Sequence, residues 1–228
     1  MENAENYAAL SKNTVDAKNQ LKTSDYVFFE NPEGKGKRFL FVGNSMTLHG
    51  IREEIGWHGL WGMSASAKEK DYVHIIMRKI RETDSDAAFC ICQVSEWECN
   101  YKNGSGILDS FEAARAFDAD CIIMRFVENC KKADFDSPVF KDEMGKLLSY
   151  LNPSGKAKTI MTTGFWRHPG DEAIRAYAEE HSLPLAELGD LGDDDKMKAI
   201  GLFAHSGVAN HPGDLGMEMM AMRILEKV

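Results

Sequence analysis

Ser45 lies just after an apolar stretch, RFLFVG, at residues 38–43. A serine at such a turn can present its hydroxyl where the next helix begins, and backbone N–H groups there can face an anion. Gly43, Asn44 and Ser45 are also ordinary turn and helix-cap residues, so position alone does not establish a reactive serine. The chemistry that this placement would permit is nucleophilic attack by an activated hydroxyl.

Two further residues supply the groups that a reactive serine needs. Asn129 ends the segment MRFVEN and could donate an amide N–H to an oxyanion. His211 lies in a Gly/Pro loop, NHPGDLG, before the last helical segment and could act as a general base. Alone, either residue is more often a plain loop residue with a solvated side chain. Together, a hydroxyl, a base and an oxyanion donor favour acyl-transfer chemistry.

The elements that must position these residues alternate between apolar stretches and helical patterns. The apolar stretches cover residues 38–43, 87–94, 120–127, 157–165 and 183–188. Apolar residues have helical spacing in four segments, of which 107–114 and 143–151 are short. The first long segment contains Val73, Ile76, Met77 and Ile80. The second contains Met217, Met220, Ala221, Ile224, Leu225 and Val228. This alternation predicts an α/β fold, a three-layer, flavodoxin-like α/β/α domain around a parallel five-stranded sheet. Ligands of such sheets bind at the carboxyl ends of the strands, where Ser45, Asn129 and His211 are expected.

Residues 1–36 differ from the remainder of the chain. They are polar and then pass through YVFFENPEGKGK, which predicts a helix followed by an extended segment. We therefore predict an N-terminal appendage at 1–36 and one domain at 37–228. The appendage either packs on the domain or reaches away from it. The sequence leaves open whether it is an arm that forms a homo-oligomer.

Composition excludes several classes of partner. The chain is 43% hydrophobic and 28% charged, as is usual for globular proteins, and its net charge is -9. An acidic surface disfavours nucleic acid and anionic membranes as partners. The N-terminus has no apolar signal segment, which predicts a cytoplasmic protein. Five irregularly spaced cysteines do not indicate a disulfide framework.

Three of the four tryptophans lie in or beside predicted edge loops. Tryptophans occur at positions 57, 61, 97 and 166, where they would either line the mouth of a pocket or pack loops onto the sheet. The histidines at 49, 58, 168 and 205 lack the spacing of metal ligands. We therefore predict no metal and no cofactor.

The segments GNSMT, DCIIMRFVEN and HPGDLGM together resemble the conserved blocks of the SGNH/GDSL hydrolases, in the family's order. The resemblance spans about residues 38–228. It implies that Ser45 is the nucleophile and one oxyanion donor through its own N–H, that Asn129 is a second donor, and that His211 is the general base. The implied reaction is hydrolysis of a small ester through an acyl-enzyme. An O-acetyl group on a carbohydrate is the favoured substrate, and thioesters or short-chain lipid esters stay open.

The sequence departs from this pattern around the histidine. The family's acid stands three residues before it, and that position is Val208, which cannot orient an imidazole. Either the site is a Ser–His dyad, a backbone carbonyl holds the ring, or another carboxylate serves, with Glu128 and Glu98 as candidates.

Two further departures concern oxyanion donors. Ser95 stands where the family has a glycine, and its backbone N–H could still donate. Gly62 is an alternative donor, or simply a loop glycine. Val127 replaces the usual glycine two residues before Asn129, and would either narrow the pocket or end the strand.

Two other functions compete with an esterase. The first is a catalytically inactive protein of the same fold that binds carbohydrate or serves as a scaffold, as the absence of the usual acid suggests. The second is a flavin or nucleotide binder, but GNSMTLHG lacks the glycine spacing of a phosphate-binding loop.

Overall fold

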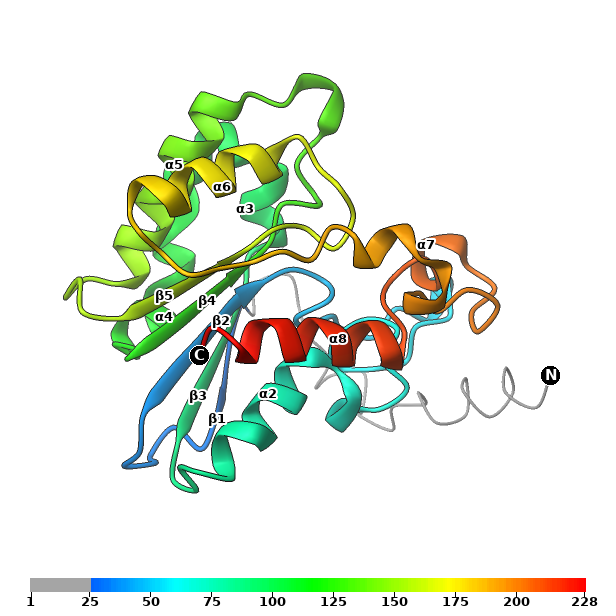
Figure 1. Ribbon diagram of the computed structural model, residues 1–228, viewed down its shortest axis with the longest axis horizontal. Helices are drawn as coiled ribbons and strands as arrows, with labels where there is room; N and C mark the ends of the chain where they lie inside the picture. Colours follow the sequence, from blue (N-terminus) through cyan, green and yellow to red (C-terminus); the bar gives the residue numbers. More distant parts are fainter. Residues whose placement is uncertain (1–25) are drawn as a thin grey trace.

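Five parallel strands and one antiparallel strand form the central sheet in the computed structural model, which describes residues 26–228 (Figure 1). The strands are β1 (Val27–Glu30), β2 (Arg38–Gly43), β3 (Ala88–Gln93), β4 (Cys121–Arg125), β5 (Lys158–Thr162) and β6 (Leu185–Ala186). Their order is β1-β3-β2-β4-β5-β6. The predicted α/β/α fold is thus confirmed, and all five predicted parallel strands are present.

The predicted strand count was one too low. β1 pairs antiparallel with β3, so that Val27 lies opposite Cys92 and Glu30 opposite Phe89. Part of the segment predicted as an appendage therefore adds an edge strand to the same sheet. The helix predicted near the N-terminus lies outside the described residues.

Each face of the sheet is covered by its own helices because alternate strand residues point to opposite faces. Phe39 and Phe41 of β2 pack with α2 (Tyr72–Arg81) and α8 (Asp214–Leu225). Leu40 and Val42 pack in the opposite layer. That layer contains α3 (Ser95–Cys99), α4 (Glu112–Ala116), α5 (Ser137–Leu151) and α6 (Gly170–Glu180), as Figure 1 shows.

The two long amphipathic helices match their predicted buried faces. Val73, Ile76, Met77 and Ile80 are all buried in α2, whose N-cap Asp71 accepts a hydrogen bond from the backbone N–H of His74 at 2.7 Å. In α8, Met217, Met220, Ala221 and Ile224 are buried, whereas Val228 lies beyond the helix end. The segment predicted as a helix near residue 107 is instead a 3₁₀-helix, Tyr101–Phe111, followed by α4.

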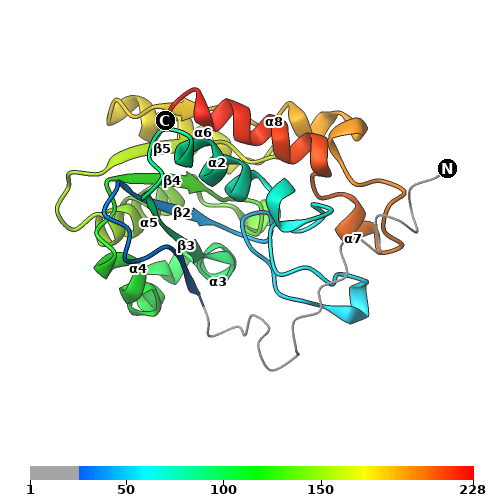
Figure 2. The same ribbon diagram turned by 90° about the horizontal axis from the view of Figure 1, so that it is seen from below.

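Loops at the carboxyl ends of the strands collect at one end of the molecule. The segment after β2 and the short helix α7 (Ser206–Ala209) lie there together in both views (Figures 1 and 2). Among residues 26–228, no helix is long and apolar enough to cross a membrane.

Candidate active site

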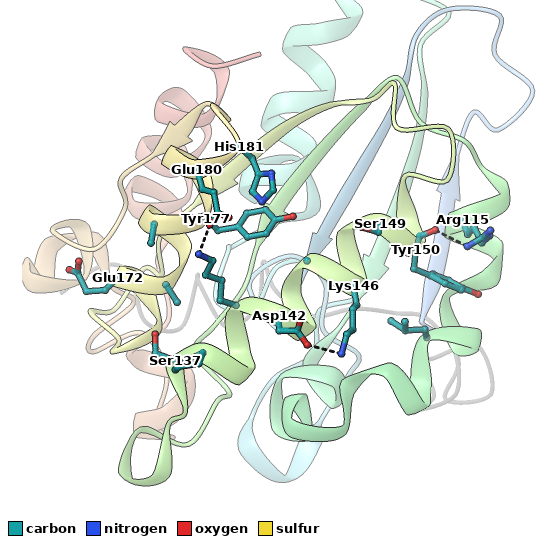
Figure 3. Close-up of a pocket in the computed structure, with 16 residues that line it drawn as sticks. Arg115, Ser137, Asp142, Lys146, Ser149, Tyr150, Glu172, Tyr177, Glu180 and His181 are labelled. Atoms are coloured by element: carbon teal, nitrogen blue, oxygen red, sulfur yellow. Dashed lines mark hydrogen bonds and ion pairs between the residues drawn. The ribbon is translucent and has the colours of Figure 1, made fainter.

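Two hollows are candidates for a functional site. The larger, about 960 Å³, lies between α5 and α6 (Figure 3). Both of its lysines pair with carboxylates of the same hollow, Lys146 with Asp142 at 2.7 Å and Lys141 with Glu180, and its histidine, His181, lies against the Tyr177 ring. The smaller, about 570 Å³, is lined by Ser45, Asn129 and His211. We take the smaller cavity as the candidate site, since it brings the sequence-predicted groups together.

Ser45 is held in a tight turn that follows β2. The N–H groups of Thr47 and Leu48 donate to the carbonyl of Asn44 at 2.9 and 3.0 Å, and the carbonyl of Ser45 accepts from Met63 N–H at 2.8 Å. Gly43 must be small, because a Cβ there would lie 1.8 Å from Thr47 Oγ1. The turn therefore fixes where the Ser45 hydroxyl points.

His211 faces Ser45 from the loop between α7 and α8. Its Nε2 lies 2.9 Å from Ser45 Oγ, and its Nδ1 lies 2.7 Å from the carbonyl oxygen of Gly207. A carbonyl only accepts, so Nδ1 carries the proton and Nε2 is free to accept one from the serine. Burial lowers the pKa of His211 to about 4, which keeps the imidazole neutral at physiological pH.

The two candidate acids do not hold the imidazole. Glu98 Oε1 and Glu128 Oε2 both accept from the side-chain amide of Asn44, at 3.0 and 2.6 Å. Glu128 also pairs with the buried Arg125. Within residues 26–228, the group bonded to His211 Nδ1 is the Gly207 carbonyl, which is one of the alternatives that the sequence left open.

The four predicted oxyanion donors divide into two groups. Among the described residues, Ser45 N–H has no hydrogen-bond partner, and Asn129 lines the cavity. By contrast, Ser95 N–H donates to Gln93 Oε1 at 2.9 Å, and Gly62 N–H donates to the buried carboxylate of Asp71 at 2.9 Å. The N–H groups of Ser95 and Gly62 are therefore already hydrogen-bonded within the protein and are not free for an oxyanion.

Aromatic side chains differ in whether they reach the cavity. Trp57 and Trp61 are buried in the core on one face of the sheet, and Trp97 of α3 is buried in the core on the other face. Trp166 lines the cavity, and its ring meets His211 edge-on, with centroids 5.1 Å apart. This contact limits the tilt of the imidazole that Gly207 already holds.

Two groups of this site were missed by sequence reasoning. Arg125 ends β4, is fully buried, and donates to Asn44 Oδ1 at 2.6 Å. Its charge within the apolar stretch CIIMRFV was the available signal, because buried arginines need partners. Asn44 had no comparable signal, since its role arises only from tertiary contacts.

Comparisons with known proteins identify the fold of this chain. No protein-family model and no curated protein sequence matches this chain. A psychrotrophic esterase, EstA, from Pseudoalteromonas sp. is similar in structure, with 11% identity, a TM-score of 0.54 and coverage of 84% of this chain and 96% of that one. An acetyl xylan esterase, AlAXEase, is similar with 15% identity, a TM-score of 0.55 and coverage of 84% and 99%.

A third similar structure bears the family name. It is a member of the lipolytic protein G-D-S-L family from Veillonella parvula, with 16% identity, a TM-score of 0.50 and coverage of 83% of this chain and 96% of that one. The chain therefore has the fold of the SGNH/GDSL esterases, as the sequence resemblance predicted.

Proposed function

We propose that this protein is a serine esterase that works through an acyl-enzyme. The observation that carries the proposal is the 2.9 Å contact between Ser45 Oγ and His211 Nε2, with the proton of the imidazole held on Nδ1 by Gly207. His211 takes the serine proton as Oγ attacks the ester carbonyl, and then gives it to the leaving alcohol. Water, activated by the same imidazole, releases the acid and restores the serine.

The tetrahedral intermediate carries a negative charge on the former carbonyl oxygen. Ser45 N–H and the side-chain amide of Asn129 are the donors that we assign to this charge, because both adjoin the cavity. No metal or cofactor enters this mechanism.

We infer that the substrate is a small ester, with an O-acetyl group on a carbohydrate as the favoured one. The cavity is lined by polar groups that suit sugar hydroxyls, among them Arg52, Gln93 and Glu96. One similar structure is described as an acetyl xylan esterase, which supports the same class of substrate.

The proposal is tested by intact-mass analysis after treatment with a fluorophosphonate probe. We expect a single adduct on the wild type and none on Ser45→Ala. Hydrolysis of p-nitrophenyl acetate and of acetylated xylo-oligosaccharides then measures turnover and substrate class. A folded wild-type protein that gives neither adduct nor turnover would overturn the proposal in favour of an inactive binding or scaffold protein.

Asn129→Ala is expected to lower kcat for p-nitrophenyl acetate by about 10²–10³-fold, the usual effect of losing one oxyanion donor. KM should change little, because the bond forms with the developing charge and not with the ground-state carbonyl. The measurement is steady-state hydrolysis beside the wild type. A change within twofold would remove Asn129 from the site.

A further inference from the structure

Glu98 is a fully buried carboxylate at the end of α3 that gathers donors from two other loops. Its Oε1 accepts from Asn44 Nδ2 at 3.0 Å and from Val127 N–H at 2.5 Å. Its Oε2 accepts from Asn129 Nδ2 at 2.7 Å. Burying a carboxylate costs free energy unless hydrogen-bond donors surround it. These contacts are therefore a fixed part of the site.

Val127 needs this support because of its backbone. Its φ is 142°, a conformation that favours glycine and that a β-branched residue rarely adopts. The hydrogen bond to Glu98 holds the N–H, and the side chain fills space left by two glycines. A Cβ on Gly170 would lie 2.5 Å from Val127 Cγ2, and one on Gly164 would lie 2.9 Å from Cγ1. The backbone of the segment that carries Asn129 is thus held in place at Val127.

Glu98 also fixes the orientation of the Asn129 amide. A carboxylate only accepts, so the atom of Asn129 that faces Oε2 must be the nitrogen and not the oxygen. One N–H of Asn129 goes to Glu98, and the second N–H is left for the cavity that Asn129 lines. Without the carboxylate, the amide could turn and present its oxygen to a developing oxyanion, which would repel it.

We propose that Glu98 is a positioning residue, which holds the Val127 backbone and the Asn129 amide in the geometry that stabilises the oxyanion. This role rests on the proposed esterase function. It differs from that of a triad acid, because Glu98 acts on the oxyanion donor and His211 is held by Gly207.

The protonation of Glu98 gives this role a signature in the pH profile. Burial and the neighbouring charge of Glu128 raise the pKa of Glu98 to about 7. The other ionisable groups around it are the thiols of Cys99 and Cys130, whose pKa values are raised, and Arg125, which is bonded to Glu128 and Asn44. Glu98 therefore gains a proton as the pH falls through about 7, whereas His211 stays neutral down to about pH 4.

The test is Glu98→Gln, which keeps the shape but places an amide against the donors. At pH 8 we expect kcat for p-nitrophenyl acetate to fall about 10–100-fold, with KM within about twofold. In the double variant Glu98→Gln/Asn129→Ala, kcat should fall no more than about threefold below Asn129→Ala alone, because both changes remove the same interaction. The acid limb of the wild-type profile should lie near pH 7 and should move lower in Glu98→Gln.

Each arm can overturn the proposal. Three results would each refute the positioning role of Glu98. The first is a wild-type kcat in Glu98→Gln, and the second is a pair of losses in kcat that multiply in the double variant. The third is an acid limb of the pH profile that Glu98→Gln does not move. If Glu98→Gln does not fold, NMR spectra of the wild type replace it. The side-chain amide signals of Asn129 should shift with pH at the same midpoint as the activity profile. Amide signals that do not shift would also refute the positioning role of Glu98. A wild type without turnover or fluorophosphonate adduct is a different result, since it refutes the esterase function itself.

Discussion

Ser45→Ala is expected to reduce ester hydrolysis by at least about 10⁴-fold while the fold is retained. Removing the nucleophile of a Ser–His enzyme leaves only the oxyanion donors and substrate binding, and losses in such enzymes reach about 10⁶-fold. The substitution removes a single oxygen, whose hydrogen bond is to His211 Nε2. The turn itself is held by backbone bonds to Asn44 and Met63, which alanine keeps. The measurement is kcat/KM for p-nitrophenyl acetate, with circular dichroism as the check on folding.

Ser95→Ala is the matched control for this experiment. Ser95 is a second serine that lines the same cavity, but its hydroxyl accepts from Gln93 and does not meet a histidine. It should keep activity within a few-fold of the wild type and should still carry the fluorophosphonate adduct. Turnover in Ser45→Ala equal to that of Ser95→Ala would show that the serine at position 45 is not the nucleophile.

The sheet was predictable wherever local patterns decide the structure. The apolar run of β2 and the spacing of Val73 to Ile80 in α2 follow from periodicity, and both elements are present. β1 was predicted as an extended segment but not as part of the sheet, because it has only four residues, lies at an edge and is partly exposed. Its pairing depends on β3, about sixty residues further along the chain, and no local pattern reports such a partner.

The candidate site was predictable only at the level of residue types at strand ends. Ser45, Asn129 and His211 could be found because each lies in a short block at the carboxyl edge. The roles of Glu98 and Glu128 could not, because a carboxylate's partners are set by three-dimensional packing. The positive φ of Val127 had one indirect signal, the glycine that the SGNH/GDSL pattern has at this position, whereas valine itself argues against it.

A carbonyl in place of a carboxylate beside His211 has a chemical consequence. The Gly207 oxygen selects the same tautomer that an aspartate would, so the base still points at Ser45. It carries only a partial charge, however, and stabilises the imidazolium less than a full negative charge would. The low pKa of His211, about 4, follows from burial without such a charge. In the proposed mechanism, catalysis then depends more heavily on the oxyanion donors, which is where we propose that Glu98 acts.

His211→Ala is expected to lower kcat/KM for p-nitrophenyl acetate by at least about 10³-fold, because the serine hydroxyl loses the base that takes its proton. Fluorophosphonate labelling of Ser45 should slow in parallel, since it uses the same activated oxygen. His181→Ala is the matched control: His181 lies against Tyr177 in the hollow between α5 and α6, away from the site, and its loss should leave turnover unchanged (Figure 3). Retention of more than a tenth of wild-type activity in His211→Ala would instead point to another base, and His49 and His205, which line the same cavity, would be the next residues to replace.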